Sequence, residues 1–172
     1  MRNAIANFVR IVDAINDALG RGVAWLTIGM VLGYCLVVLL RYAFGIGSVA
    51  LQESVTYMHA LVFMLAAAYT LRTDGHVRVD IFYGSWPQRR QDWVNLFGSL
   101  FLLLPLAIFL LLASWGYVSD SWSRRETSVE AGGLAYVYLL KSIILVMAAQ
   151  LIGTALARAG EVGLRLAHKD KN

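Results

Sequence analysis

Four long stretches with almost no charged side chains dominate this sequence. Residues 22–40, 54–71 and 93–119 contain no Asp, Glu, Lys or Arg. A fourth stretch, 135–157, contains only Lys141, whose ammonium can reach the membrane interface from the first two turns of a helix. About 20 mostly apolar residues cross the roughly 30 Å of hydrocarbon in a bilayer. We therefore predict an all-α integral membrane protein, a single membrane domain over 1–172, with spans at about 22–43, 53–71, 93–119 and 135–157 and a tail at 158–172.

The composition agrees with lipid as the solvent. Hydrophobic residues make up 59% of the chain and charged residues 15%, which leaves too little polar surface for a soluble domain of this length. The net charge of +4 would also suit nucleic acid, but with this hydrophobicity we interpret it as a topology signal. One cysteine, Cys35, rules out an internal disulfide, and no Cys or His cluster has metal-site spacing. We expect no enzymatic activity, no metal, no cofactor and no nucleic-acid partner.

The basic residues are distributed unequally between the two sides of the predicted bundle. Of the 15 Lys and Arg residues, 11 fall in the N-terminal segment, the connection between the second and third spans, and the C-terminal tail. Positive charge concentrates on cytoplasmic loops, so we expect both termini and the middle connection in the cytoplasm. Tryptophans and tyrosines near the predicted span ends fit an aromatic belt: Trp25, Trp93, Trp115, Trp122, Tyr42, Tyr117 and Tyr136.

The segment before the first span is amphipathic. Apolar residues recur at helical spacing within 3–19, with polar residues opposite them. We predict an interfacial helix lying along the cytoplasmic membrane face; a helix packed on a soluble partner is the alternative.

The second span carries a polar stripe. Gln52, Thr56, His59, Phe63, Ala66 and Thr70 share one helical face, and Glu53 and Tyr57 belong to the neighbouring face. Polar groups in hydrocarbon must find partners, so this stripe should contact protein. An intramembrane histidine is a functional candidate, but a lone His59 also suits one interhelical hydrogen bond. Glu53 could pair with Arg41, which ends the preceding span.

Small residues and one proline mark further packing positions. Gly29 and Gly33 form a GxxxG step in the first span, and Ala149, Gly153 and Ala157 repeat a small-xxx-small pattern in the fourth. Such faces let helices approach closely, either within the bundle or against a partner. Pro105 should kink the third span because it removes a backbone hydrogen bond. The middles of the spans carry few polar groups, and internal repeats are lacking, so the chain is typical of an accessory subunit rather than a complete transporter.

Three segments resemble a known family. They are RYAFGIGSVALQE (41–53), AAAYTLRTDGHVRVD (66–80) and ETSVEAGGLAYVYLLKS (126–142). Together they resemble the small membrane subunit, the Q or DctQ-type subunit, of tripartite ATP-independent periplasmic (TRAP) transporters. The resemblance covers about 20–157, and its most specific motif contains Arg72, His76, Arg78 and Asp80.

The resemblance implies a scaffold role in a bacterial inner membrane. It implies a large M subunit that holds the substrate and sodium sites, and a periplasmic binding protein that delivers an organic acid. It therefore implies an accessory subunit of an ion-coupled secondary transporter, in contact with membrane lipids. We expect the M subunit to contact Arg41, Gln52, Glu53, Thr56, Tyr57, His59, Thr70, Gly29 and Gly33. The loop 120–133 would face the periplasm, with Arg124, Arg125, Glu126 and Glu130 docking the binding protein or forming an ordinary solvated turn.

Two other functions remain open from the sequence. A membrane anchor of a redox complex would need two axial histidines at similar depth, and of the three histidines only His59 lies within a predicted span. A small transporter or channel acting alone would have to take up solute without any partner.

Overall fold

The structure is an all-helical bundle of long rods. The computed structural model describes residues 2–73, 75 and 83–169, so His76, Arg78 and Asp80 lie outside the described residues. Its elements are α1 (Arg2–Phe44), α2 (Val49–Arg72), α4 (Gln88–Phe97), the π-helical segment η1 (Gly98–Leu103), α5 (Leu104–Ser123) and α6 (Val137–Lys169). Among the described residues, four helices are long and apolar enough to cross a membrane: Asn3–Phe44, Val49–Arg72, Gln88–Ser123 and Val137–Leu166. The predicted fold class and number of spans are confirmed.

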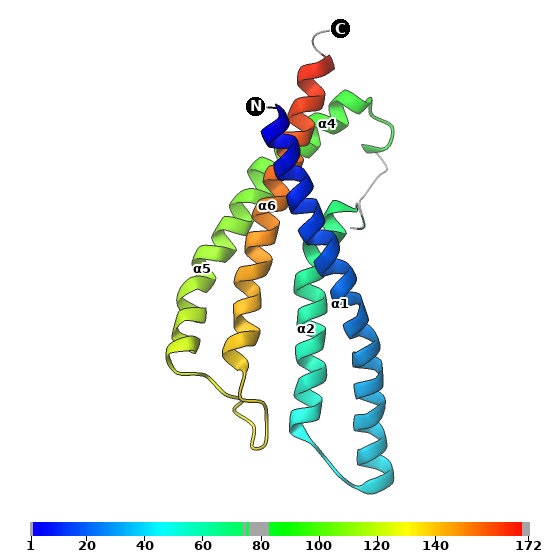
Figure 1. Ribbon diagram of the computed structural model, residues 1–172, viewed down its shortest axis with the longest axis vertical. Helices are drawn as coiled ribbons and strands as arrows, with labels where there is room; N and C mark the ends of the chain where they lie inside the picture. The colour runs from blue at the N-terminus through cyan, green and yellow to red at the C-terminus, as the bar shows by residue number, and fades with distance from the viewer. Residues whose placement is uncertain (1, 74, 76–82, 170–172) are drawn as a thin grey trace.

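The N-terminal amphipathic segment is not a separate helix. It continues without a break into the first span, so α1 is one helix of 43 residues (Figure 1). The reason is a heptad pattern that runs through both parts, with positions alternately four and three residues apart and none of them exposed. This inner seam comprises Ile5, Val9, Val12, Asn16, Leu19, Val23, Leu26, Met30, Gly33, Val37 and Leu40.

The glycine step of the first span packs within the chain. A Cβ built on Gly33 would lie 2.9 Å from Val55 Cγ2, and one on Gly29 would lie 3.2 Å from Met58 Sδ. Val55 and Met58 belong to α2, so the two glycines bring α1 and α2 together as a hairpin. Of the two alternatives for this motif, the structure shows packing inside the bundle.

The turn between α1 and α2 follows from local sequence. Gly45 adopts φ +65°, a left-handed conformation that suits glycine after a helix end. Ser48 then caps α2, because its hydroxyl accepts a hydrogen bond from the Leu51 N–H at 3.3 Å.

The third membrane-crossing helix contains a π-helical segment just before its proline. Pro105 lies at the start of α5, directly after η1. There the Leu104 N–H bonds to the Ser99 carbonyl, five residues earlier. Proline lacks an N–H and its ring crowds the carbonyl four residues before it, so a wider turn accommodates it. The structure thus has a π-helical segment next to Pro105, and a kink of the span there stays a prediction.

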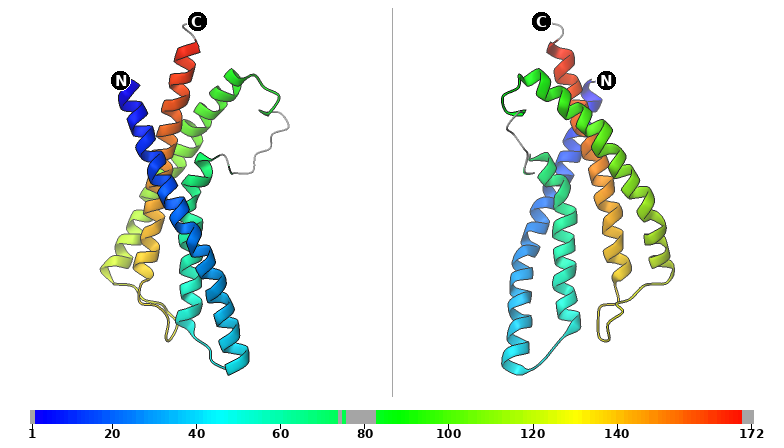
Figure 2. Two further views of the ribbon diagram at one scale, coloured as in Figure 1. Left: turned by 45° about the vertical axis from the view of Figure 1, so that its right-hand side comes forward. Right: turned by 180° about the vertical axis from the view of Figure 1, so that it is seen from behind.

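The rods form two hairpins that meet along α6. Both chain termini lie at one end of the molecule, and the α1–α2 turn and the α5–α6 loop lie at the other, where the hairpins diverge (Figures 1 and 2). Small side chains let the helices touch: Ala107, Ala148 and Ala155 are fully buried. α6 extends to Lys169, so the helix continues through most of the predicted tail 158–172, and its last turns bury Val162 and Leu166.

Candidate functional surfaces

The polar stripe of α2 points out of the bundle. Within Val49–Arg72, the exposed residues are Gln52, Thr56, His59 and Phe63, all on that stripe. The Thr56 hydroxyl donates to the Gln52 carbonyl at 3.2 Å, and the His59 ring stacks on Phe63 with centroids 6.4 Å apart. Neither contact reaches another helix. The Thr56 hydroxyl is bonded within α2, whereas the Gln52 amide and the His59 ring have no hydrogen-bond partner among the described residues.

A groove of about 600 Å³ runs beside this stripe between α1 and α2. Its α2 wall contains Gln52, Thr56 and His59, and its α1 wall contains Tyr34 and Arg41. Three of the residues expected at a subunit interface on the stripe are thus brought together with Arg41. Thr70 is only partly exposed and donates back to the Ala66 carbonyl, so it belongs less to this surface.

Glu53 does not make the ion pair with Arg41 that the sequence allowed. Its carboxylate accepts hydrogen bonds from the Ser128 hydroxyl and from the Leu134 N–H, the latter at 2.6 Å. Both donors belong to the α5–α6 loop, which therefore crosses to α2 at the end where the hairpins diverge. A Cβ on Gly133 would lie 2.8 Å from Glu53 Oε2, so this close approach requires glycine.

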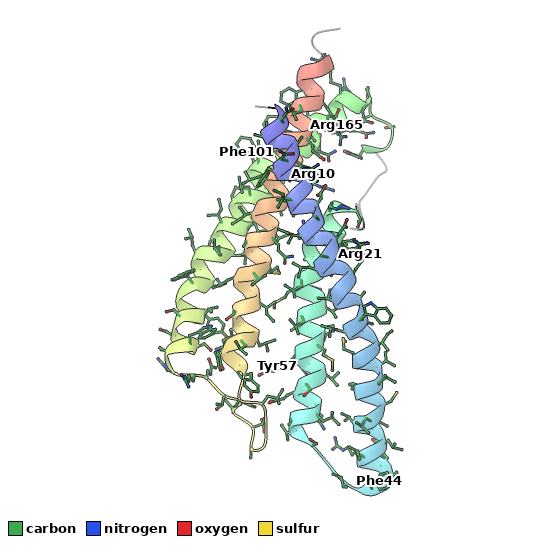
Figure 3. All side chains as sticks on the ribbon, in the orientation of Figure 1. Arg10, Arg21, Phe44, Tyr57, Phe101 and Arg165 are labelled. Carbon is green, nitrogen blue, oxygen red and sulfur yellow. The ribbon has the colours of Figure 1, made fainter. Side chains whose placement is uncertain are left out.

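Tyr57, one turn from Glu53, lies between the two hairpins (Figure 3). Its hydroxyl is buried and has no hydrogen-bond partner within the described residues. Tyr57 and Glu53 both face the α5–α6 hairpin. α2 therefore carries two separate sets of polar groups, one facing that hairpin and one on the exposed stripe.

The loop residues expected to dock a binding protein divide into two groups. Glu126 is half-buried and accepts a hydrogen bond from Lys141 Nζ at 2.5 Å, and this bond holds the pKa of the Glu126 carboxyl below its ordinary value. The Lys141 ammonium also sits 3.9 Å from the centre of the Tyr117 ring. Arg124 and Arg125 remain exposed.

The far tip of the same loop is also exposed. Glu130 is exposed, and the neighbouring Val129 is 98% exposed. The Gly133 N–H bonds to the Glu130 carbonyl at 3.0 Å, which closes the loop on itself. The tip is therefore a short, hydrogen-bonded turn that presents an apolar side chain beside a carboxylate.

Sequence reasoning missed a polar junction where α1, α2 and α6 cross. Asn16 and Thr154 are 1% and 2% exposed, and the Asn16 amide donates to the Thr154 hydroxyl at 2.8 Å. Arg72 lies 2.8 Å from an Asp17 carboxylate oxygen, and Arg158 donates to the Leu71 carbonyl. The available signal was Asn16, a polar residue at an inner heptad position.

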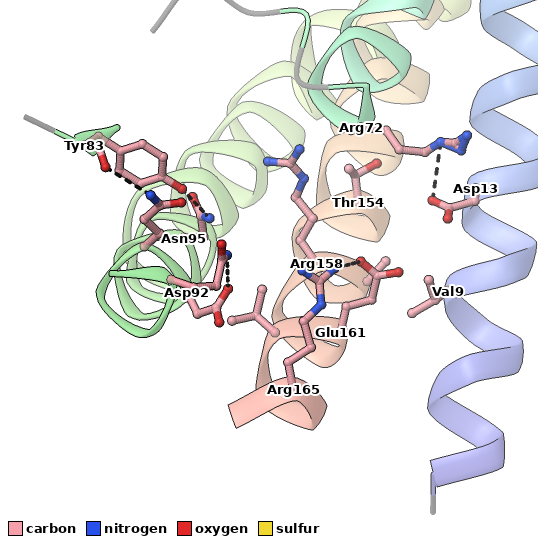
Figure 4. Close-up of a pocket in the computed structure, with 14 residues that line it drawn as sticks. Val9, Asp13, Arg72, Tyr83, Asp92, Asn95, Thr154, Arg158, Glu161 and Arg165 are labelled. Carbon is pink, nitrogen blue, oxygen red and sulfur yellow. Dashed lines mark hydrogen bonds and ion pairs between the residues drawn. The ribbon is translucent and has the colours of Figure 1, made fainter. Parts of the chain in front are cut away.

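Beside this junction lies a polar pocket of about 520 Å³ between α1, α4 and α6 (Figure 4). Asp13 faces it from α1, at 3.7 Å from Arg72. Asp92 on α4 is only 4% exposed and accepts a hydrogen bond from Gln88 at 3.2 Å. The basic and acidic side chains in its walls largely pair with one another. Arg72, the described residue of the family motif, thus has a role in the chain's own packing.

The arrangement contains no constellation suited to catalysis in the part of the chain that the structure describes. Within those residues there is no group of three or more His, Cys, Asp or Glu that could hold a metal ion. The polar groups instead tie helices together or lie on outward faces.

Comparison with known proteins gives one match. The sequence model of a family described as "Tripartite ATP-independent periplasmic transporters, DctQ component" matches residues 30–161, well over half of the chain. No curated protein and no solved structure matches.

Proposed function

The chain belongs to the DctQ family, the small membrane component of tripartite ATP-independent periplasmic transporters, and we propose that it is the fixed scaffold subunit of one such transporter. It is a transporter component and not an enzyme. In this proposal a large M subunit carries the transport sites, and a periplasmic binding protein delivers an organic acid. Uptake is coupled to an ion gradient, sodium in the simplest case.

The exposed polar stripe of α2 supports this proposal most directly. Gln52, Thr56 and His59 lie on a helix apolar enough to span the membrane, yet they face away from the rest of the chain. In hydrocarbon such groups need hydrogen-bond partners, and lipid tails offer none. A second membrane protein, the M subunit, would supply those partners along the groove that Arg41 also lines.

Copurification with the M subunit tests the interface. The triple change Gln52→Leu, Thr56→Val, His59→Leu removes about three hydrogen bonds at roughly 0.6 kcal/mol each. The dissociation constant should then rise about 20-fold, measured by pull-down in mild detergent. Phe109→Ala, on the exposed face of α5, is the control and should leave binding unchanged.

Transport separates a scaffold role from a direct one. His59→Leu alone should weaken assembly at most, and a fully assembled complex that carries it should still transport. If that assembled complex is inactive, His59 takes part in transport and the scaffold proposal is wrong. Uptake by the chain alone in liposomes would also refute it.

We propose that both termini lie in the bacterial cytoplasm. The positive-inside pattern assigns both termini to the cytoplasm. The two termini lie at the same end of the bundle (Figure 1), as an even number of spans requires. Cysteine labelling at the termini and at the 124–136 loop, in right-side-out vesicles, tests this orientation.

The α5–α6 loop would then face the periplasm and contact the binding protein. Arg124, Arg125 and Glu130 are exposed for such a contact, whereas Glu126 is already bonded to Lys141. Arg124→Glu with Arg125→Glu should reduce uptake several-fold and leave the membrane complex intact, because rim charges act mainly on association. Lys→Glu changes in the C-terminal tail are the control, and unchanged uptake in the arginine variant would contradict the docking proposal.

A further inference from the structure

The polar pocket between α1, α4 and α6 contains a buried carboxylate that has no cationic partner within the described residues. Asp92 lines this pocket from α4 (Figure 4) and is only 4% exposed. Among the described residues its hydrogen-bond donor is the neutral Gln88 amide, at 3.2 Å, and it forms no ion pair there. Burying a carboxylate without a compensating positive charge is unfavourable. A positively charged group bound in the pocket would supply that compensation.

The α6 wall of the same pocket carries two arginines, Arg158 and Arg165 (Figure 4). Arg165 lies 3.6 Å from a Glu161 carboxylate oxygen, and its side chain is 61% exposed. A guanidinium has five N–H donors in a planar fork, so this one contact leaves Arg165 with donors for further oxygens. This wall therefore suits the oxygens of an anionic group.

The charges in the pocket walls balance. Among the described residues that line it, three are basic and three are acidic: Arg72, Arg158, Arg165, Asp13, Asp92 and Glu161. A purely anionic ligand would leave Asp92 without a positive charge, and a purely cationic ligand would be repelled by the arginines. A ligand that carries one charge of each sign meets both requirements. The pocket volume, about 520 Å³, is in the range of small-molecule sites.

The pocket lies at the depth where hydrocarbon gives way to lipid headgroups. Arg72 and Arg158 directly follow the second and fourth apolar stretches, and Asp92 directly precedes the third. The first charged residues at the ends of membrane-crossing helices mark the boundary of the hydrocarbon. Pockets between such helices that carry basic side chains at this boundary bind lipid headgroups. A phospholipid headgroup with both charges is therefore the ligand that fits the depth and the chemistry.

We propose that this pocket binds the headgroup of a membrane phospholipid with a primary ammonium group, phosphatidylethanolamine. The ammonium group donates hydrogen bonds to the Asp92 carboxylate, and the phosphate accepts hydrogen bonds from Arg158 and Arg165. Phosphatidylcholine has the same phosphate and net charge, but its quaternary ammonium has no N–H to donate to Asp92. All of the residues in the site belong to this chain, so the binding does not depend on any protein partner.

Native mass spectrometry of the purified, delipidated full chain tests the site. The chain is titrated in detergent with phosphatidylethanolamine, phosphatidylcholine and phosphatidylglycerol that carry identical acyl chains. Phosphatidylethanolamine should bind roughly tenfold more tightly than the other two, the ratio that one charge-assisted hydrogen bond provides. Equal binding of the three lipids would overturn the proposal, and it is the result expected if Asp92 holds a proton instead of a ligand.

Substitution of the carboxylate provides the second arm. Asp92→Asn keeps the size of the side chain and removes its charge, so this variant should bind phosphatidylethanolamine and phosphatidylcholine equally. Asp120→Asn, the same change at an exposed carboxylate at the far end of α5, is the matched control and should keep the preference. A preference that survives in Asp92→Asn would overturn the proposal.

Soluble phosphoethanolamine, the headgroup without acyl chains, identifies the source of the ligand. It should compete with the lipid only weakly, because acyl chains hold the lipid headgroup at the depth of the pocket. An affinity for the soluble compound equal to that for the lipid would assign the pocket to a soluble zwitterion and overturn the lipid proposal.

Discussion

Replacing Asn16 by leucine tests whether the buried polar junction stabilises the crossing of α1 and α6. The Asn16 amide donates to the Thr154 hydroxyl at 2.8 Å, and that hydroxyl donates in turn to the Gln150 carbonyl at 2.8 Å. Asn16→Leu removes the first bond and leaves one acceptor position of Thr154 unpaired in a buried site. The lost hydrogen bond and the unpaired buried acceptor together should lower the free energy of unfolding by about 2 kcal/mol.

The expected change is measurable as a thermal midpoint. For a chain of this size, about 2 kcal/mol corresponds to roughly 4–8 °C, read by circular dichroism or tryptophan fluorescence of the purified protein in detergent. Thr154→Val should have a comparable effect, since it leaves the buried Asn16 amide unpaired. The double variant should be within about 1 kcal/mol of the wild type, because replacing both partners by apolar groups is nearly neutral.

Two results would refute this reasoning. Additive losses in the double variant would show that the two side chains do not depend on each other. Equal losses for Asn16→Leu and for Asn7→Leu, an exposed position on the same helix, would show that burial of Asn16 is not the cause.

Three further predictions concern the helix hairpins and the loop. Gly33→Leu should destabilise the α1–α2 hairpin by about 1–3 kcal/mol in thermal unfolding, since its Cβ would lie 2.9 Å from Val55 Cγ2. Because Lys141 lowers the pKa of Glu126, their contact should stabilise the loop fully above the ordinary carboxyl value of 4.5 and be lost as the pH falls through the lower, folded-state pKa. The protection of the loop amides from hydrogen exchange, relative to their intrinsic exchange rate at the same pH, should therefore stay constant from pH 8 to 5 and fall only below, and Lys141→Gln should remove this acid sensitivity. Arg125→Gly should raise the thermal midpoint by the equivalent of about 0.5–1 kcal/mol, because Arg125 holds φ +45°, where a side chain is strained.

The architecture of the membrane portion followed from the sequence because its physical cause is local. A bilayer demands long apolar stretches with all backbone hydrogen bonds made within the segment, so the presence of four helices able to cross it was predictable. That Gln52, Thr56 and His59 share one face was also predictable, since this spacing brings them together on any helix, but the outward direction of that face was not. The family match over residues 30–161 agrees with the resemblance drawn from short segments.

Where the helices end and what each polar group contacts depended on tertiary packing. The sequence predicted residues 3–19 and the first span as two separate elements. In the structure they form one helix, because burial of the inner heptad seam against α6 stabilises a continuous helix although its surroundings change from polar to apolar. The sequence indicated that Glu53 could pair with Arg41. Instead, the α5–α6 loop, 75 residues further on, brings the Ser128 hydroxyl to it.

The sequence by itself thus determined that this chain is a membrane protein and how many helices can cross the bilayer. It also determined which helix faces carry polar groups, since all of these depend on hydrophobicity and helical period alone. Only the tertiary structure decided which of those faces are already occupied. Gly29 and Gly33 are covered by α2, whereas the α2 stripe remains exposed. Occupancy depends on contacts between residues far apart in the chain, and no local pattern specifies those contacts.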